Sequence, residues 1–284
     1  MTPTPPNDRL RAIAGAIADA LPPAVAEVVL TGSVSRGVAD DLSDIEMLVV
    51  THDEPELAEC YAHSAGCGVS DLGTWGSQGG PGKRVSGYRD GVPVELIWWP
   101  SAHAERAVDA IIDGELSGTA DALANGVALR TSGLLARWQE RLRDYPDELA
   151  RSRIEEAALT WGGFAAAGLL TIARPGERLA LVERMVDDAA RVVRIVFALN
   201  RVWQPTHKRL AARAASLERK PERLAGRIEQ ALTEPDPHAA LLTMTELQAE
   251  TVALAPDGPN VVRARAWLAE AREILLRAQT ALPQ

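Results

Sequence analysis

The chain has 284 residues, 46% of them hydrophobic, and carries a formal net charge of −9 at pH 7. This length favours two domains, and the hydrophobic content is ample for buried cores. The acidic balance argues against a general nucleic-acid binder, because affinity for a phosphate backbone comes from clustered Lys and Arg.

Several features of the sequence bear on its compartment. It has no apolar run of the roughly 18 residues that a membrane helix needs, and the start MTPTPPNDRL lacks a hydrophobic segment behind basic residues. The two cysteines, Cys60 and Cys67, are too few for a disulfide framework and lack the second pair of a zinc site. We therefore expect a cytoplasmic protein without a signal peptide, a membrane span or a zinc site.

The N-terminal part begins with a predicted helix over residues 7–21, which Pro22 ends, and a strand follows. The next stretch, LTGSVSRGVADDLSDIEMLVV over residues 30–50, predicts the end of that strand, a glycine-serine turn and a second strand headed by Asp44 and Glu46. Because side chains alternate along a strand, these two carboxylates point to the same face. Such a pair suits a hard cation such as Mg²⁺, which takes oxygen ligands and leaves positions for water and substrate phosphates.

The turn between the two strands has the composition of a phosphate site. Gly32 can adopt backbone angles closed to other residues, and with no side chain it lets a phosphate approach the main chain. Ser33 adds a hydroxyl and can cap a short helix whose free amide groups would attract a polyphosphate. The sequence therefore predicts phosphate binding at this turn and metal binding on the next strand.

The spacing of these residues resembles that of the nucleotidyltransferase superfamily that includes DNA polymerase β. It is most similar to the small bacterial branch of antibiotic adenylyltransferases and minimal nucleotidyltransferases. The matching residues are Thr31-Gly32-Ser33, Arg36-Gly37, Ser43 and Asp44-Ile45-Glu46-Met47. The alternative is a glycine turn followed by surface acids that match this pattern by chance.

The resemblance implies a metal-dependent nucleotidyltransferase. In such an enzyme Asp44 and Glu46 would hold two Mg²⁺ ions that clamp the attacking and leaving oxygens. The nucleotide-binding residues that it implies in this part of the chain are Gly32, Ser33, Arg36 and Ser43.

The glycine-rich stretch GTWGSQGGPGK, residues 73–83, predicts a loop that either carries substrate specificity or forms a disordered hairpin tip. Two strand-like runs follow, KRVSGYR and VPVELIWW, joined by Asp90-Gly91, which is a strong signal for a tight β-hairpin.

Glu95 is the only charged residue in the apolar run VPVELIWWP, which predicts a central strand where an unpaired carboxylate would be costly. The resemblance implies a third carboxylate on a neighbouring strand, as metal ligand or as general base for the attacking hydroxyl. Glu95 fits that role by position and strand context. The alternatives are an exposed strand edge or a salt bridge to Arg84 or Arg89.

From Ser101 onward strand signals nearly vanish, and the periodicity predicts a bundle of helices that includes residues 153–172 and 177–202. In the second of these helices the apolar residues recur at steps of three and four, which predicts a buried face. The residues of that face are Leu179, Val182, Val186, Ala189, Val193 and Val196.

The segment FALNRVWQPTHKRL, residues 197–210, gathers polar and basic side chains where a long helix ends at Pro205. The resemblance implies a helical C-terminal domain that closes over the nucleotide and lends basic groups to the triphosphate. Lys208 and Arg209 would take that nucleotide-binding role, with Trp203 packing on a base or on the seam between domains. The alternative is a helix end made basic by the helix dipole alone.

The predicted fold class is α+β, with a mixed β-sheet nucleotidyltransferase domain over residues 1–115, an all-α helical-bundle domain over residues 116–284, and the site in the cleft between them. The expected reaction transfers AMP from ATP to a hydroxyl of a small antibiotic-like molecule and releases pyrophosphate. Asp44, Glu46 and Glu95 are the expected catalytic and metal-binding residues. Such an enzyme would confer antibiotic resistance.

Other acceptors and roles stay open at this point. The acceptor can instead be a side chain of a partner protein, or the domain can bind nucleotide without transferring it. The sequence leaves open which nucleoside triphosphate is used and whether a homodimer completes the site. We expect no nucleic-acid partner.

Overall fold

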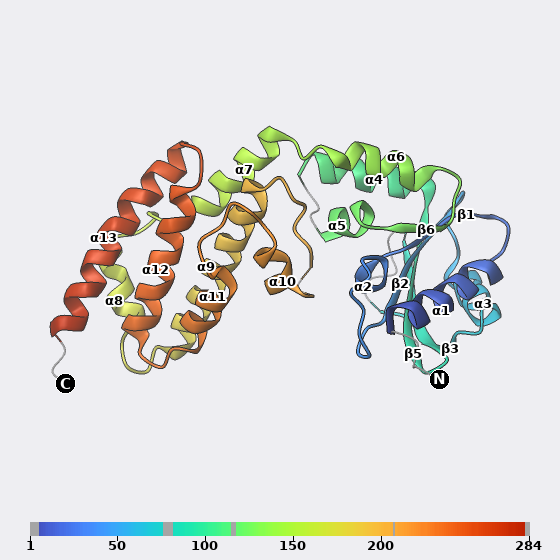
Figure 1. The fold of residues 1–284 in the computed structure, drawn as a ribbon, viewed down its shortest axis with the longest axis horizontal. Helices are drawn as coiled ribbons and strands as arrows, with labels where there is room; N and C mark the ends of the chain where they lie inside the picture. Colours follow the sequence, from blue (N-terminus) through green and yellow to red (C-terminus); the bar gives the residue numbers. More distant parts are fainter. Residues whose placement is uncertain (1–5, 76–81, 115–117, 207, 282–284) are drawn as a thin grey trace. The chain divides into compact units, whose positions relative to one another are not determined.

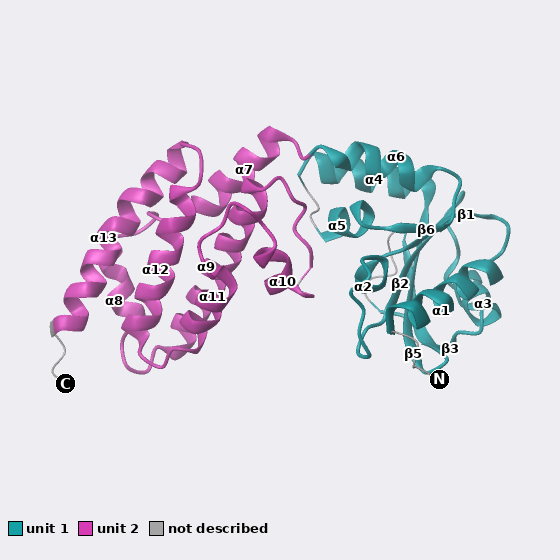
Figure 2. Cartoon of the chain, in the orientation of Figure 1, with its two compact units in different colours: residues 1–144 teal, residues 145–284 magenta. Residues whose placement is uncertain are grey.

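The computed structural model describes residues 6–75, 82–114, 118–206 and 208–281. The chain divides into two compact units, unit 1 ending at Asp144 and unit 2 beginning at Tyr145 (Figure 2). None of the helices in the described part of the chain combines the length and hydrophobicity that a bilayer crossing requires.

Unit 1 is built on a six-stranded sheet in the order β3-β4-β5-β2-β1-β6. Figure 1 shows the ribbon of this unit at the N-terminal end of the chain. Strands β2 and β5 run parallel, and the other neighbouring strands are antiparallel, so the predicted mixed sheet is confirmed. The strands are β1 (Val25–Leu30), β2 (Ile45–Thr51), β3 (Ser70–Gly73), β4 (Lys83–Arg89), β5 (Val92–Pro100) and β6 (Val127–Arg130).

Helices cover both faces of this sheet. On one face, Leu10 and Ile17 of α1 and Cys60 of α3 share a hydrophobic core with alternate strand residues such as Ile45 and Leu96. Against the other face lie α4 and α6, with α5 packed on these two helices, and the strand residues there include the buried Leu48 and Val50. The helices of unit 1 are α1 (Pro6–Ala20), α2 (Gly32–Ser35), α3 (Leu57–Gly66), α4 (Ser101–Ile112), α5 (Gly118–Ala124) and α6 (Leu134–Arg143).

The predicted β-hairpin at Asp90-Gly91 is confirmed. Both residues have positive φ, 52° and 75°, which is the backbone that a two-residue turn with the twist of its strands requires. Strands β4 and β5 pair directly on either side of this turn, from Arg89–Val92 to Lys83–Trp98. The turn therefore sets the register that places Glu95.

The sequence predicted a domain boundary near residue 115. In the structure, unit 1 extends to Asp144. The unpredicted strand β6 pairs with β1, and Arg130 in it donates hydrogen bonds of 2.6–2.8 Å to three carbonyls at the C-terminal end of α1 and just beyond it. From β1, the buried Glu27 accepts hydrogen bonds from the start of α6. Strand β6 and the start of α6 thus contact the N-terminal part of unit 1 through residues far away in the sequence. The spacing of apolar residues does not reveal such contacts.

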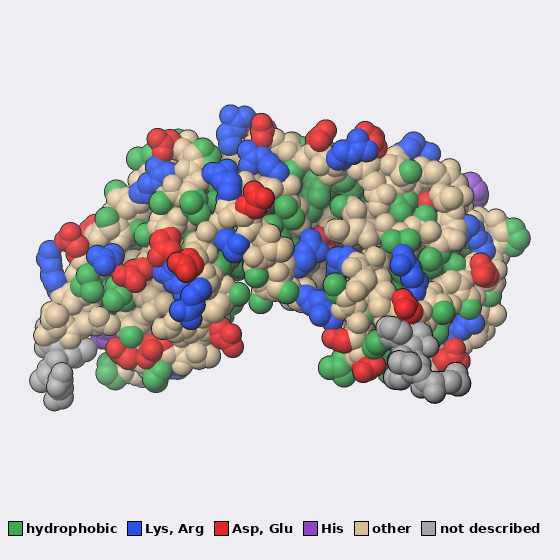
Figure 3. All heavy atoms as spheres, in the orientation of Figure 1, with side chains coloured by type: hydrophobic (Ala, Val, Ile, Leu, Met, Phe, Trp, Pro, Cys, Tyr) green, Lys and Arg blue, Asp and Glu red, His purple; other side chains and the backbone are tan. Residues whose placement is uncertain are grey.

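The described residues of unit 2 form helices and no strands, as predicted, with a core drawn mainly from α7, α9, α12 and α13. On the face shown in Figure 3, acidic and basic side chains are interspersed over unit 2, in keeping with ion pairs such as Arg227–Glu250. Its elements are α7 (Asp147–Ala158), a 3₁₀ turn (Ala166–Gly168), α8 (Leu169–Ile172), α9 (Arg178–Leu199), α10 (Leu210–Ala215), α11 (Leu224–Thr233), α12 (Pro237–Ala253) and α13 (Pro259–Ala281).

The single helix predicted over residues 153–172 is wrong, because the helix stops at Ala158 and restarts as the 3₁₀ turn and α8. Gly162 has φ +101°, outside the helical region, and a Cβ at this position would lie 3.1 Å from Cγ of Arg263. A glycine without a side chain therefore allows both the reversal and the close approach of α13.

The buried face of α9 differs from the predicted one along the first half of the helix. Leu179, Val182 and Val186 are 83%, 40% and 53% exposed, whereas Leu181, Met185 and Asp188 are buried. Only the C-terminal half follows the prediction, where Ala189, Val193 and Val196 are buried. The displacement is accounted for by Asp188, whose carboxylate accepts hydrogen bonds from Trp161 at 2.9 Å and from Arg184 at 2.6 Å inside the bundle.

Candidate functional site

The predicted carboxylates come together at one end of the sheet. In the parallel pair β2–β5, Glu46 lies directly opposite Glu95, and on the other side of β5 Ser86 of β4 lies opposite Glu95. Residues that face each other across neighbouring strands point to the same side of the sheet. Glu46, Glu95 and Ser86 therefore form one row, and β5 is the central strand that the sequence predicted for Glu95.

This row is on the face that α4 and α6 cover only in part. Farther along β2, Leu48 and Val50 are buried on that face, whereas Glu46 and Glu95 keep part of their surface exposed. Asp44 precedes β2 by one residue. The sheet thus changes, within two residues along one strand, from a covered apolar face to a partly open polar one.

Gly32 lies in direct contact with the site. Its φ is +70°, and a Cβ on it would fall 1.9 Å from Oε2 of Glu46, so any other side chain would displace the carboxylate. The preceding residue, Thr31, donates from its backbone N–H and its hydroxyl to the carbonyl of Glu46, at 2.9 and 3.2 Å. The glycine-serine turn and strand β2, which carries Glu46, were inferred separately from the sequence and are in direct contact in the structure. Ser33 lies in the short helix α2 that follows.

Arg36 and Ser43, the other two residues expected to bind nucleotide in this unit, both have protein partners. Arg36 follows α2, and its Nη1 donates to Oδ2 of Asp121 in α5 at 3.2 Å. Ser43 closes an exposed turn with Asp40, donating from its hydroxyl to Oδ1 at 2.9 Å and accepting from the backbone N–H of Asp40 at 3.0 Å. Ser43 thus shapes the approach to Asp44.

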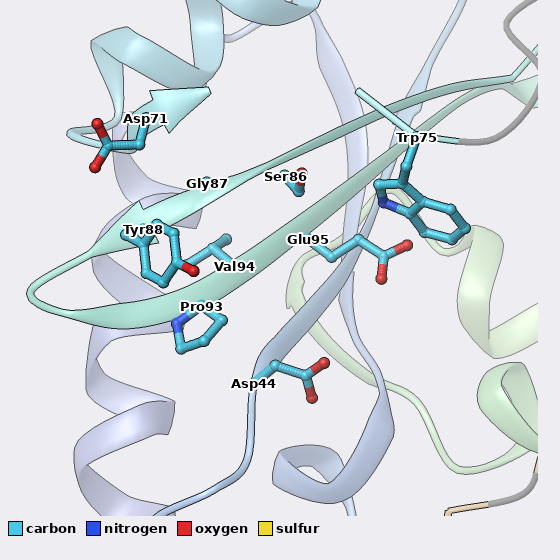
Figure 4. Close-up of a pocket in the computed structure, with 9 residues that line it drawn as sticks. All are labelled: Asp44, Asp71, Trp75, Ser86, Gly87, Tyr88, Pro93, Val94 and Glu95. Atoms are coloured by element: carbon cyan, nitrogen blue, oxygen red, sulfur yellow. The ribbon is translucent and has the colours of Figure 1, made fainter. Parts of the chain in front are cut away.

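A pocket of about 210 Å³ opens beside this row (Figure 4). The carboxylates of Asp44 and Glu95 point toward the same side of the hairpin, and the indole of Trp75 lies on that side as well. Glu46 is not one of its lining residues, which come from β3, β4, β5, the residue before β2 and the segment after β3. The lining residues are Asp44, Asp71, Trp75, Ser86, Gly87, Tyr88, Pro93, Val94 and Glu95.

Two of the pocket walls are aromatic, and the sequence did not single them out. Trp75 and Tyr88 are 45% and 48% exposed, so part of each ring faces solvent. The guanidinium of Arg84 lies over the Trp75 ring, 4.6 Å from its centroid, and this cation–π contact holds the indole. Trp75 belongs to the predicted glycine-rich loop, whose residues 76–81 lie outside the described residues. The position of Trp75 in this glycine-rich loop was the sequence signal that could have identified it as a pocket residue.

The remaining predicted nucleotide ligands belong to unit 2. Lys208 and Arg209 are exposed, Arg209 has φ 57° and precedes α10, and His207 lies outside the described residues. Trp203 is buried and packs against Tyr145 with ring centroids 4.4 Å apart and the rings tilted by 34°, so it is part of the packing of unit 2. The role of Lys208 and Arg209 at a triphosphate stays a prediction.

In the described part of the chain, no three His, Cys, Asp or Glu side chains are grouped as a preformed metal cage. The two cysteines are buried and unbonded to each other, and burial raises the pKa of the Cys60 thiol to about 12. A thiol with so high a pKa stays protonated at neutral pH and is a poor metal ligand.

Comparisons with known proteins add little to this geometry. Residues 118–210 match the profile of a family described only as a domain of unknown function, DUF4037. No curated protein sequence matches the chain. A solved nucleotidyltransferase-like protein from Exiguobacterium sibiricum 255-15 aligns with 96% of this chain and 91% of its own, at 12% identity and a TM-score of 0.39. Likeness at this level of identity and TM-score carries no argument for a family or an activity.

Proposed function

We propose that this protein is a metal-dependent nucleotidyltransferase that transfers AMP from ATP to a hydroxyl of a small molecule. The observation that carries the proposal is the contact of Gly32 with the carboxylate of Glu46, in a row with Glu95. A turn suited to phosphate and a strand of carboxylates occur in many proteins separately. Here the turn adjoins the carboxylates at one end of one sheet face, and they have the spacing of the nucleotidyltransferase pattern.

The donor set fits magnesium by its chemistry. Asp44, Glu46 and Glu95 offer only carboxylate oxygens, and Mg²⁺ is commonly bound through one or two carboxylates, with water and substrate phosphates supplying the rest of its ligands. A preformed cage of three side chains is therefore not required. When bound, the metal would neutralise charge on the attacking and leaving oxygens. Asp44 and Glu46 are the residues that would hold it, with Glu95 as the third ligand or as the base.

The side chains of unit 1 would then divide the remaining tasks. The Gly32-Ser33 turn and Arg36 would bind the β- and γ-phosphates, and Ser43 would keep the segment before Asp44 in place. Glu95 would take the proton from the acceptor hydroxyl, whose oxygen bonds to the α-phosphorus as the bond from that phosphorus to the bridging oxygen breaks. Pyrophosphate leaves with the bond electrons.

The pocket beside Asp44 and Glu95 supports a small-molecule acceptor. Its volume of about 210 Å³ suits one ring, and the exposed aromatic faces of Trp75 and Tyr88 offer stacking surfaces for it. An antibiotic-like molecule with a hydroxylated ring is the class we favour. A side chain of a partner protein is the second candidate, because a single side chain also fits this volume.

The test is label transfer by the purified protein with Mg²⁺ and each α-labelled nucleoside triphosphate. The acceptors offered are aminoglycosides, lincosamides and a cell lysate, and the label is located by mass. We expect label on a small molecule with ATP as donor. Asp44→Asn should abolish transfer, whereas Asp113→Asn, an exposed acid at the end of α4, should keep it.

Full activity of Asp44→Asn would overturn the proposal. Label on a lysate protein would move the case to a protein-modifying enzyme. Nucleotide binding without any transfer would make the chain a nucleotide-binding module.

A further inference from the structure

The glycine-serine turn and the short helix α2 that it forms (Gly32–Ser35) are connected to helix α5 through an ion pair that is largely shielded from solvent. Arg36 directly follows the turn, and its Nη1 lies 3.2 Å from Oδ2 of Asp121 in α5, 85 positions later in the chain. The two side chains keep only 17% and 5% of their surfaces exposed. An ion pair that is shielded from solvent is screened far less than a surface pair, so it fixes the position of the guanidinium.

Asp121 is itself held in place. Its Oδ1 accepts a hydrogen bond of 3.0 Å from the side chain of Asn125, one helical turn farther on. Gln139 of α6 donates to the carbonyls of Leu123 and Gly126 at 3.2 and 2.9 Å, which anchors the end of α5. At Gly126 a Cβ would lie 2.7 Å from Cγ1 of Val29 in β1, so α5 ends against the sheet. The carboxylate of Asp121 therefore has a fixed place relative to the strands.

The arginine keeps capacity for a ligand. A guanidinium carries N–H donors on three nitrogens in a planar fork that matches phosphate, and the contact with Asp121 uses Nη1. Part of the Arg36 side chain remains exposed, so a ligand can reach it. An arginine anchored at one nitrogen needs to lose little side-chain freedom when another nitrogen binds an anion.

We propose that Asp121 is a positioning residue that holds Arg36 at the end of the Gly32–Ser35 turn, ready for the triphosphate of the nucleotide. This inference rests on the proposed function, in which Arg36 contacts phosphate. Asp121 does not touch the nucleotide and acts through Arg36.

The experiment measures the dissociation constants of Mg-ATP and of adenosine by calorimetry, for the wild type and for Asp121→Asn. The amide keeps the size of the side chain and removes its charge, so Arg36 is no longer fixed. We expect the constant for ATP to rise about tenfold, the scale seen when the partner of a binding residue is removed. Adenosine has no phosphate, so its constant should stay unchanged. Asp109→Asn is the control for removing the charge of an ion-paired aspartate elsewhere in unit 1, because Asp109 pairs with Arg141 between α4 and α6 at a more exposed position.

A double-mutant cycle separates positioning from general stability. In an Arg36→Ala background, Asp121→Asn should cause no further loss of ATP affinity. Equal loss for ATP and adenosine, or an unchanged constant for ATP, would show that the ion pair is only structural. If Asp121→Asn does not fold, Arg36→Lys replaces it, because lysine keeps the charge and loses the fork. ATP binding by Arg36→Lys as tight as that of the wild type would then overturn the inference. A wild type that binds no nucleotide would overturn the proposed function and the inference together.

Discussion

The same face of the sheet in unit 1 carries carboxylates in two regions with different surroundings. At one end, Glu27 of β1 is fully buried beneath α6, and its two oxygens accept five hydrogen bonds of 2.6–3.3 Å from residues 131–135. At the other end, Asp44 and Glu95 line a pocket. A buried charge is tolerated only when it is fully bonded, as Glu27 is.

The difference teaches how to separate structural from functional acids in this fold. Glu27 caps α6 and joins it to β1, so its removal should affect stability and should change chemistry only through folding. Asp44 and Glu95 border space that a ligand can enter, so their removal should affect chemistry and leave folding largely intact. The predictions for Glu95 and Glu27 test this contrast directly, and those for Trp75 and Asp188 extend it to the pocket wall and to a buried acid of unit 2.

Of these four variants, Glu95→Gln is expected to have the largest effect. Loss of a general base typically lowers turnover by about 10²–10⁴-fold, and the isosteric amide should leave the unfolding midpoint near that of the wild type. Turnover by the transfer assay and thermal unfolding by circular dichroism measure the two quantities. A large fall in stability with little change in turnover would place Glu95 with Glu27 as a structural acid.

The next effect is expected for Glu27→Gln, which should lower the free energy of unfolding by about 2–3 kcal/mol. The amide removes the charge and leaves donors at the start of α6 without a full set of acceptors. Denaturant unfolding measures the change. Glu56→Gln is the control, because Glu56 caps α3 at an exposed position where water can replace the lost bonds. Similar losses for the two variants would contradict the distinction drawn from burial.

A smaller effect is expected at the pocket wall. Trp75→Ala should raise the KM for the acceptor about tenfold, because it removes the ring that the acceptor stacks against, and should leave the KM for ATP unchanged. Trp75→Phe keeps an aromatic face and should behave nearly as the wild type does. An equal rise in the KM values for the acceptor and for ATP would mean that Trp75 supports the structure of the site and does not contact the acceptor specifically.

The smallest effect concerns Asp188 in unit 2. Burial raises its pKa, against the opposing charge of Arg184. The carboxyl group of Asp188 therefore binds a proton more tightly in the folded state than in the unfolded state. The stability that this difference contributes is complete below about pH 4, the pKa of an aspartate in the unfolded chain, and is lost as the pH rises through the pKa of Asp188 in the folded state. Unfolding midpoints between pH 4 and 8 should fall with pH in the wild type more than in Asp188→Asn. Parallel curves would contradict this prediction.

Predictions from sequence succeeded where the signal is local. The helix near the N-terminus, the strands around the glycine-serine turn and the hairpin at Asp90-Gly91 all follow from patterns a few residues long. They failed where a distant partner decides. Strand β6 forms because β1 offers it an edge, and Asp188 of α9 is buried where Trp161, 27 residues earlier in the chain, donates a hydrogen bond to it.

For the candidate site, the sequence by itself determined the chemistry: a glycine that permits close approach, two carboxylates on one side of a strand, and a third in an apolar run. These are properties of residue type and spacing. Because side chains alternate along a strand, the spacing alone determines which side chains point to the same face. Only the tertiary structure decided which groups meet. Strand register brings Glu95 opposite Glu46, and chain reversal places Trp75 and Tyr88 around the pocket. Folding also gives Arg36 a partner in Asp121, because contacts between residues far apart in sequence depend on how whole elements pack.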